Sequence, residues 1–180
     1  MFSGDDDGLG WYSRISLNYF IDKQGREYIF RFGSIKDFQG LLEMYSKFEP
    51  KRSIMGVPPE NPVELKLWVK HFFTENTKNI VVMDPDKKIT GHAAIFPIDK
   101  CICEYFMALL PTNQSSGIGR TLCINVIETA RYLKFKKVWI CVEKTNTKAL
   151  NLHKKMGYKV NGGGFGEDYE LEVEVDKFRV

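Results

Sequence analysis

Residues 103–120, CEYFMALLPTNQSSGIGR, join a strand pattern to a helix pattern through a polar loop with two glycines. The apolar residues up to Leu110 predict a strand, and those from Ile118 onward recur at helical spacing. Gly117 and Gly119 allow the backbone to approach a ligand closely and to adopt dihedral angles that other residues avoid. The start of the helix leaves N–H groups without partners at the positive end of its dipole. This segment therefore predicts an anion site suited to a pyrophosphate.

An ordinary turn between a strand and a helix is the simpler alternative, because two glycines alone are common in such turns. Two better-known phosphate loops are excluded by the residues present. No Gly-Lys-Ser/Thr follows, as a Walker loop requires. The third glycine of the dinucleotide-binding fingerprint is also absent.

The rest of the chain alternates helix and strand signals around this segment. Ser34 and Asn61 are placed to cap helices, and Asp22 to Gly25 is a hairpin turn. The short links between the middle strands favour antiparallel neighbours. The order predicts an α/β sheet that is antiparallel first and then joined by helical crossovers. The expected elements are strands 11–21 and 27–32, helices 34–50 and 61–73, strands 79–84, 89–98 and 101–110, helix 118–133, strand 137–143, helix 145–156 and strand 169–175.

The composition predicts one globular domain. The chain has 180 residues, of which 43% are hydrophobic and 27% charged. We expect a disordered tail at residues 1–10 and a single domain at residues 11–180. No run of 18 apolar residues occurs, so no membrane partner is expected. The N-terminus lacks the features of a signal peptide, which favours a cytoplasmic protein.

The net charge of +3 is unevenly distributed. Residues 131–159 contain nine Lys or Arg and one acid, Glu143, whereas residues 167–176 contain six acids and no base. A basic stretch suits a nucleic acid, a phosphorylated cofactor, or simply a solvated helix face. Nucleic-acid binding requires aromatic residues or a recognition helix among the bases. The aromatic residues there are only Tyr132, Phe135, Trp139 and Tyr158, and Trp139 lies in an apolar strand. We therefore expect no nucleic-acid partner.

The cysteines predict neither a metal site nor a disulfide. Cys101 and Cys103 are too close in sequence for an unstrained bridge, and no second pair has zinc-ligand spacing. No histidine lies near them. We expect buried free thiols in a reducing compartment, including Cys123 and Cys141.

Two segments at the right separation resemble the GNAT superfamily of N-acetyltransferases. Residues 114–119, QSSGIG, are similar to its Gln/Arg-x-x-Gly-x-Gly/Ala signature. Residues 146–158, NTKALNLHKKMGY, resemble its Asn-x-x-Ala-x-x-x-Tyr-x-x-x-Gly-Phe segment, with His153 at the tyrosine position. The element order matches over about residues 26–176. The resemblance implies a mixed, mostly antiparallel sheet that is splayed at the cofactor site, about four flanking helices, and an extra N-terminal strand.

The resemblance implies acetyl-CoA as the acyl donor. In the family, backbone N–H groups of the loop hold the pyrophosphate, and the end of the preceding strand pairs with the pantetheine arm. The strands 101–110 and 137–143 would separate to admit the thioester. The residues implied for coenzyme A are Leu109, Leu110, Gln114, Ser115, Ser116, Gly117, Ile118, Gly119, Arg120 and Asn146.

Amine attack on a thioester needs an acceptor for the amine proton. Glu104 lies about where many family members keep a carboxylate, and its apolar neighbours are expected to raise its pKa. The alternative is that Glu104 reaches the cleft without a chemical role. His153, with an ordinary pKa of about 6.5, is expected to donate a proton to the departing thiolate. The alternatives are that His153 only packs against the cofactor or that the thiolate departs unaided.

The implied activity is acetyl transfer from acetyl-CoA to a primary amine of a small molecule or a protein. A catalytically inactive acyl-CoA-binding module is the alternative, because the family tyrosine is missing. Relatives often form homodimers through their C-terminal strands, so a homodimer is possible. The acidic C-terminal strand is expected to attract amines. The residues expected around the acceptor are Phe48, Met55, Pro58, Pro59, Trp68, Phe73, Tyr105 and Phe106.

Overall fold

The structure is a computed structural model that describes residues 18–48, 58–161 and 166–179. The expected tail at residues 1–10 and the first part of the N-terminal strand lie outside the described residues, and so does Met55.

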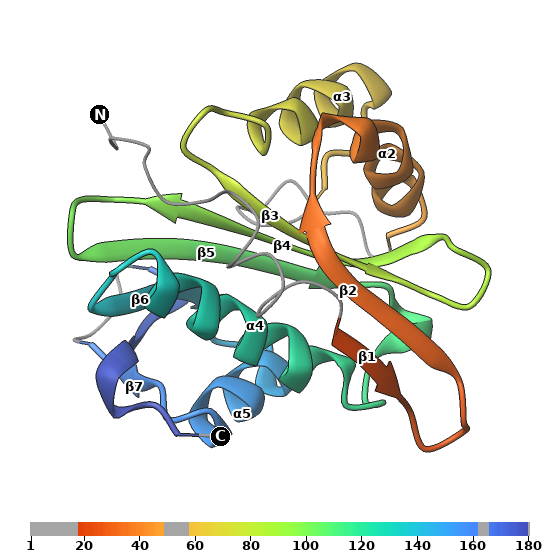
Figure 1. Cartoon of the computed structure of the whole chain (residues 1–180). Coiled ribbons are helices and arrows are strands. Elements are labelled where there is room, and N and C mark those ends of the chain that lie inside the picture. Colours follow the sequence, from red (N-terminus) through yellow and green to blue (C-terminus); the bar gives the residue numbers. More distant parts are fainter. Residues whose placement is uncertain (1–17, 49–57, 162–165, 180) are drawn as a thin grey trace, which may run out of the picture.

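The described residues form one eight-stranded sheet with the order β1-β2-β3-β4-β5-β6-β8-β7 (Figure 1). Only β5 and β6 run parallel, and the other neighbouring strands are antiparallel. This confirms the expected mixed, mostly antiparallel sheet, with β1 as the extra N-terminal strand. The strands are β1 Asn18–Ile21, β2 Glu27–Gly33, β3 Lys78–Met83, β4 Ile89–Pro97, β5 Ile102–Leu109, β6 Lys137–Glu143, β7 Lys159–Val160 and β8 Asp168–Glu174.

Four α-helices in the described residues cover the two faces of the sheet (Figure 1). The helices α2 (Phe38–Ser46) and α3 (Pro62–His71) lie on one face, and α4 (Ile118–Tyr132) and α5 (Thr147–Lys155) lie on the other. Short 3-10 turns occur at Ile35–Asp37 (η1), Pro111–Asn113 (η2) and Val175–Lys177 (η3).

The predicted caps are present. Asn61 accepts hydrogen bonds from the N–H groups of Val63 and Glu64, at 2.8 and 3.3 Å, and Pro62 occupies the first helical position of α3. Ser34 forms a capping box with Asp37, but the turn that it caps is the 3-10 turn η1. The α-helix expected from Ser34 therefore begins only at Phe38.

Alternate residues of β5 contribute to two separate hydrophobic cores. Cys103, Tyr105 and Leu109 belong to the core that includes residues of α4 and α5, whereas Ala108 belongs to the core beneath α2 and α3, with Phe106 packed against it. This alternation follows from the two-residue period of a strand. It decides on which face of the sheet each site residue lies.

One strand was not predicted, and the expectation that the cysteines are buried is corrected. The edge strand β7 was not predicted, because two residues carry too little pattern. The four cysteines are free, as expected, but only Cys103 and Cys123 are buried. Cys101 is exposed in the turn before β5, and Cys141 is half-buried on β6.

Within the described residues, no helix is both long and apolar enough to cross a membrane.

His92, which is 0% exposed, links both helices of the α2–α3 layer to the sheet. Its Nε2 contacts Asn79 Oδ1 at 2.9 Å, and its Nδ1 contacts the hydroxyl of Tyr45 in α2 at 2.7 Å. Asn79 in turn donates to the carbonyl of Phe72 at the end of α3, at 2.8 Å. An amide oxygen only accepts, so Nε2 of the ring carries the proton and Nδ1 accepts from Tyr45. Burial lowers the pKa of His92 to about 3.

The free energy of unfolding is expected to fall by about 2 kcal/mol between pH 7 and pH 5 because of His92 alone. The pKa of His92 is lower in the folded state, so the unfolded chain takes up the proton first as the pH falls below about 6.5. Urea titrations of wild type and His92→Gln measure this slope, since glutamine keeps one acceptor and one donor. The exposed His71 provides the control variant His71→Gln. Equal slopes for His92→Gln and wild type would contradict the assignment.

Candidate active site

The strands β5 and β6 separate after three residue pairs, Ile102–Glu104 with Lys137–Trp139. The N–H of Leu110 donates to Thr90 of β4 at 3.0 Å, so alternation turns the backbone groups of Leu109 away from β4. By the same alternation the carbonyl of Tyr105 and the peptide groups of Met107 and Leu109 face the gap between β5 and β6, since the N–H of Tyr105 belongs to the pairing of Glu104 with Trp139. The gap therefore offers peptide groups to an extended ligand, as expected for the splayed strands.

The loop at residues 114–117 leads into α4, and the first N–H groups of this helix have no backbone partner among the described residues. Ser115 and Gly117 have positive φ angles of 62° and 97°. The Ser116 hydroxyl donates to the carbonyl of Asn113 at 2.7 Å, which holds the loop in a tight turn. Thr121 makes the first helical hydrogen bond, to Gly117 O at 3.1 Å. The N–H groups of residues 118–120 precede that bond and lie at the positive end of the helix dipole.

The two glycines of the loop serve different purposes. Gly117 adopts a left-handed conformation, which residues with a side chain avoid. In addition, a Cβ atom there would lie 2.8 Å from Cζ of Phe20 in β1. Gly119 has no positive φ angle, which corrects the expectation that both glycines use unusual dihedral angles. A Cβ atom at Gly119 would lie 3.3 Å from Leu109 and 3.4 Å from Leu152. Gly119 therefore allows α4 to pack closely on β5 and α5.

Two other residues expected at the cofactor hold the loop and α5 in place. Gln114 donates from Nε2 to the carbonyl of Leu109 at 3.3 Å, and its Oε1 lies 3.5 Å from Lys148 Nζ. Gln114 thus ties the loop to the end of β5 and to α5. Asn146 caps α5, since its Oδ1 accepts from the N–H of Ala149 at 3.1 Å. Contact of Asn146 with the pantetheine arm stays a prediction.

Glu104 lies where β5 and β6 begin to separate. It is the last β5 residue paired with β6, opposite Trp139, and it faces Phe96 on the β4 side. Glu104 is half-buried, and burial raises the pKa of its carboxyl group above the ordinary value. A carboxylate with a raised pKa is a better proton acceptor for an amine.

His153 differs from the expectation that its pKa is close to 6.5. The side chain is 1% exposed, and burial lowers its pKa. Nδ1 lies 2.6 Å from the carbonyl of Ala149, which only accepts, so Nδ1 carries the proton of the neutral ring. Nε2 therefore accepts a hydrogen bond from the Tyr105 hydroxyl. In this arrangement the imidazole has no proton on Nε2 to give to a thiolate.

The structure does not bring Glu104 and His153 together. Glu104 shares its face of β5 with Phe106, toward the α2–α3 layer, whereas Tyr105 meets His153 on the α4–α5 side. The expectation that Tyr105 lines the floor of the acceptor site is therefore wrong, because the alternation of the strand turns its ring into the opposite core.

The variant His153→Phe is expected to lose about 1–3 kcal/mol of folding free energy, because the buried Tyr105 hydroxyl then has only the weak acceptor Cys123 Sγ, at 3.6 Å, in place of the His153 ring. The double variant Tyr105→Phe/His153→Phe should recover much of this loss, since neither partner is then left unsatisfied. Urea denaturation measures both effects. We expect kcat of folded His153→Phe to stay within about tenfold of wild type. A far larger drop in kcat with unchanged stability would instead support His153 as the proton donor to the thiolate.

Aromatic residues expected around the acceptor gather on the α2–α3 side of β5. Trp68 lies with its ring centroid 5.5 Å from that of Phe106 and 4.8 Å from that of Tyr45, and Phe48 also packs on Tyr45 at 6.3 Å. Phe73 instead pairs with Phe38, at 6.0 Å. The contribution of Tyr45 was not predicted, although its helical spacing with Leu41 and Leu42 marks it as buried.

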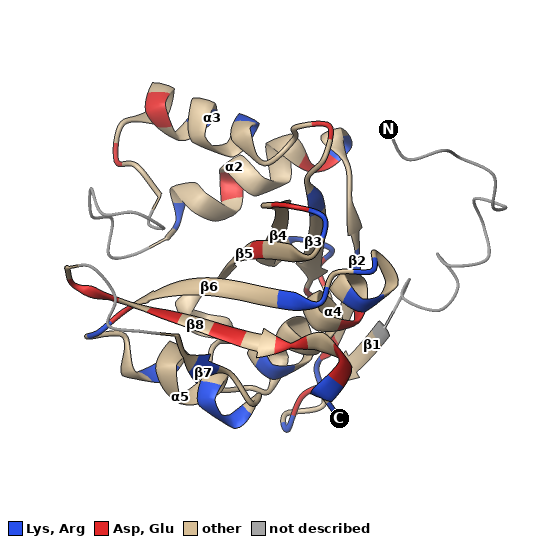
Figure 2. Ribbon diagram, turned by 90° about the vertical axis from the view of Figure 1, so that its left-hand side faces the viewer, with Lys and Arg blue, Asp and Glu red and all other residues tan. Residues whose placement is uncertain are grey.

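Carboxylates lie on the same face beyond the aromatic residues. Cys141 of β6 is opposite Glu170 of β8. Burial, and then the negative charges of Asp168, Glu104 and Glu170, raise the pKa of the Cys141 thiol. Each of these three carboxylates is therefore close enough to Cys141 to act on its thiol. Figure 2 shows the acidic residues along β8 and basic residues on α5.

Comparison with known proteins gives one family and many similar folds. The model of the acetyltransferase (GNAT) family matches residues 38–158. No curated protein matches the chain. Among solved structures, the GNAT domain of S. lividans PAT is similar with a TM-score of 0.78 and 12% sequence identity, over 94% of this chain and 99% of that chain.

Two further solved structures are similar over most of their length. An acetyltransferase of the GNAT family from Streptococcus pneumoniae has a TM-score of 0.66 and 17% identity, over 82% of this chain and 99% of that chain. Spermidine N-acetyltransferase from Vibrio cholerae, in complex with CoA and spermine, has a TM-score of 0.64 and 20% identity, over 83% and 96%. At these identities the similarity establishes the fold alone.

Proposed function

This chain belongs to the GNAT acetyltransferase family, and we propose that it transfers an acetyl group from acetyl-CoA to a primary amine. The observation that carries the proposal is the gap between β5 and β6, which ends at a helix start with free N–H groups. An amide-rich arm ending in a diphosphate matches both features.

The residues of the loop and strand end fit the acyl donor. The N–H groups of residues 115–120 would hold the diphosphate, and the backbone of Leu109 and Leu110 would border the pantetheine arm. The donor supplies a thioester at the place where β5 and β6 separate. Glu104 lies at that same place, so its carboxylate would be close to the acyl carbon.

The proton of the attacking amine passes to Glu104, directly or through one water molecule. The C–N bond forms and the C–S bond breaks, and the sulfur leaves as a thiolate that takes a proton from solvent. The neutral His153 does not supply this proton, because its Nε2 accepts from Tyr105. For His153 we propose instead a positioning role that joins α5 to β5.

The acceptor we propose is a cationic amine. The carboxylates of Glu104, Asp168 and Glu170 lie near Cys141 on the face shared with Trp139. Their summed charge raises the local concentration of a positively charged amine. The Vibrio cholerae relative was solved with spermine, which belongs to the same chemical class. A protein lysine or N-terminus also satisfies this requirement.

A catalytically inactive acyl-CoA-binding module is the second candidate function. The observation that favours it is the replacement of the family tyrosine by a buried, neutral His153. Such a module would bind acetyl-CoA and release no coenzyme A with any amine.

The test begins with thermal shifts of the full chain in acetyl-, propionyl- and succinyl-CoA, followed by an amine panel in which free thiol is measured. We expect acetyl-CoA to raise the melting temperature. We also expect at least one amine to release thiol from wild type, and far less from Glu104→Gln. Binding without release supports the inactive module, whereas no shift with any acyl-CoA contradicts both candidates.

A further inference from the structure

Asn113 is the centre of the turn that leads into the loop before α4. Its backbone N–H donates to the carbonyl of Leu110 at 2.9 Å, and its own carbonyl accepts from the Ser116 hydroxyl at 2.7 Å. Its Oδ1 accepts from the Thr112 hydroxyl at 2.9 Å, and the residue is 6% exposed. Asn113 therefore fixes both the start of the loop and the position of Ser116 within it.

The remaining polar group of Asn113 reaches a distant strand. Its Nδ2 donates to the hydroxyl of Tyr28 in β2 at 3.2 Å, and Tyr28 is 1% exposed. Because both residues are buried, water does not replace either partner when the bond is lost. Loss of this bond would leave a buried donor on Asn113 unsatisfied, and the start of the loop would have to rearrange.

The strands β1 and β2 and the turn between them, residues 18–33, form the N-terminal hairpin. This hairpin contacts the loop at a second point, because the ring of Phe20 lies against Gly117, where an added Cβ atom would come within 2.8 Å of Cζ. Asn113 and Gly117 stand on either side of residues 114–116. The hairpin therefore contacts both ends of the loop to which the diphosphate is assigned.

The N-terminal hairpin is itself held in one shape by its turn. Oδ1 of Asp22 accepts from the N–H groups of Gln24 and Arg26, at 2.9 and 3.0 Å. Oδ2 of Asp22 pairs with Nε of Arg26 at 2.7 Å. The guanidinium of Arg26 also lies over the ring of Tyr28, with 5.8 Å between Cζ and the ring centroid. These contacts fix the turn and the Tyr28 ring, so the hairpin is a stable support for the loop.

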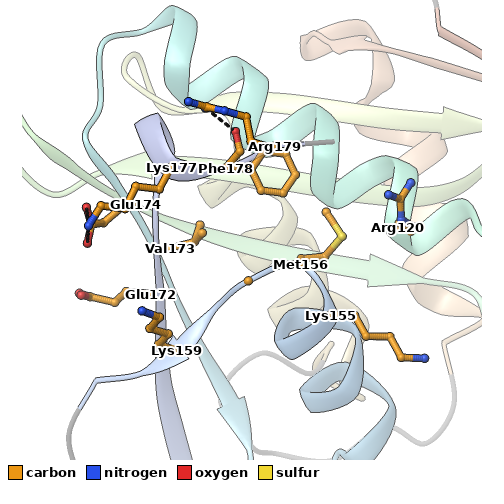
Figure 3. A pocket seen from close by; sticks show the side chains of 11 residues that line it. Arg120, Lys155, Met156, Lys159, Glu172, Val173, Glu174, Lys177, Phe178 and Arg179 are labelled. Carbon is orange, nitrogen blue, oxygen red and sulfur yellow. Dashed lines mark hydrogen bonds and ion pairs between the residues drawn. The ribbon is translucent and has the colours of Figure 1, made fainter.

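The start of α4 has an open cavity on its other side. Arg120, in the first turn of α4, lines this cavity of about 360 Å³ together with Lys155 and Met156 at the end of α5 (Figure 3). The cavity also contacts residues of β8 and β7, which form one edge of the sheet, whereas the hairpin forms the opposite edge. An open cavity offers no packed side chains, so the support by the hairpin matters more for the position of the loop.

We propose that the N-terminal hairpin sets the affinity of this chain for acyl-CoA, with Asn113 as a positioning residue of the loop and Tyr28 as its anchor. The proposal rests on the proposed function, which assigns the diphosphate to the same loop. A loop that is held at both ends loses less conformational freedom when a ligand binds, so its affinity is higher. The hairpin lies outside residues 38–158, so the family match does not account for this support.

Tyr28→Phe tests the proposal, because it removes one buried oxygen and keeps the ring. The dissociation constant of acetyl-CoA should rise about fivefold or more, which corresponds to the loss of one hydrogen bond. We expect kcat at saturating acetyl-CoA to stay unchanged, since Glu104 and the β5–β6 gap are not altered. Calorimetric titration and steady-state rates measure the two quantities. Amide hydrogen exchange at Asn113, measured without ligand, should become faster as the loop relaxes.

Tyr45→Phe is the matched control. Tyr45 is 0% exposed and its hydroxyl is bonded to His92 at 2.7 Å, so this variant also loses a buried hydroxyl, but in the α2–α3 layer. It should lower the melting temperature and leave both the affinity for acetyl-CoA and the exchange at Asn113 unchanged.

A double variant shows whether Tyr28 acts through Asn113. If it does, Tyr28→Phe/Asn113→Ala binds acetyl-CoA as weakly as Asn113→Ala alone, because the two residues act as one unit. Three results would overturn the proposal alone: wild-type affinity in Tyr28→Phe, equal weakening in Tyr45→Phe, and additive losses in the double variant. A wild-type chain that does not bind acetyl-CoA would overturn the proposed function as well.

Discussion

Glu104→Gln is expected to lower kcat for acetyl transfer by about 10²- to 10⁴-fold, the range that a positioned general base contributes. Glutamine keeps the size and the hydrogen-bonding capacity of the side chain but cannot accept the amine proton. The affinity for acetyl-CoA should stay unchanged, because no contact of the loop at residues 114–120 is altered. Single-turnover rates and calorimetric titration of acetyl-CoA measure the two quantities separately.

The pH dependence provides a second measure of the same role. Burial raises the pKa of Glu104, so its base form is lost at a higher pH than for an ordinary glutamate. The wild-type kcat should therefore fall on the acid side as the pH passes through this raised pKa, and the residual rate of Glu104→Gln should lack that limb. Glu170→Gln, which removes a nearby carboxylate from β8, is the matched control. Equal losses in the two variants would show that only the local negative charge matters.

Gly117→Ala is expected to weaken acetyl-CoA binding about tenfold or more, because the loop would shift and lose at least one charge-assisted hydrogen bond to the diphosphate. The substitution has two costs. A left-handed conformation costs a non-glycine residue about 1–2 kcal/mol. In addition, the new Cβ atom would lie 2.8 Å from the Phe20 ring, so either the ring or the loop must move.

Two further variants separate these costs. Gly157 has a similar φ angle of 82° and no atom within 4 Å of an added Cβ, so Gly157→Ala carries the conformational cost alone. It should lower the melting temperature without changing acetyl-CoA affinity. Adding Phe20→Ala to Gly117→Ala should recover the part of the affinity that the steric contact removes. An unchanged affinity of Gly117→Ala for acetyl-CoA would show that the loop does not bind the cofactor.

The elements with strong local signals were predicted well. The strand at residues 137–143 coincides with β6, and Asn61 caps α3 as expected. The position of Glu104 on the apolar face with Phe106 follows from the two-residue period of a strand, and the raised pKa follows from that burial. These features depend on neighbours that are close in sequence.

The features that were missed depend on contacts between distant segments. No pattern around His153 shows that Tyr105 will meet it, and this contact makes the ring a neutral acceptor. The same holds for Phe20 against Gly117, since the N-terminal hairpin and the loop are joined only in the folded sheet. The role of His153 was inferred from its place in a motif, whereas burial determines its protonation state.

The three residue pairs between β5 and β6 are the only ladder that joins two antiparallel blocks, β1–β5 and β6–β8, among the described strands. A short ladder is a weak connection, at which local opening costs less free energy than global unfolding. An acyl donor whose amides bond to the peptide groups of Met107 and Leu109 would extend that ladder. Amide hydrogen exchange at Met107 and Leu109 should therefore slow when acetyl-CoA is added, and the substrate itself would then strengthen the connection between the two blocks.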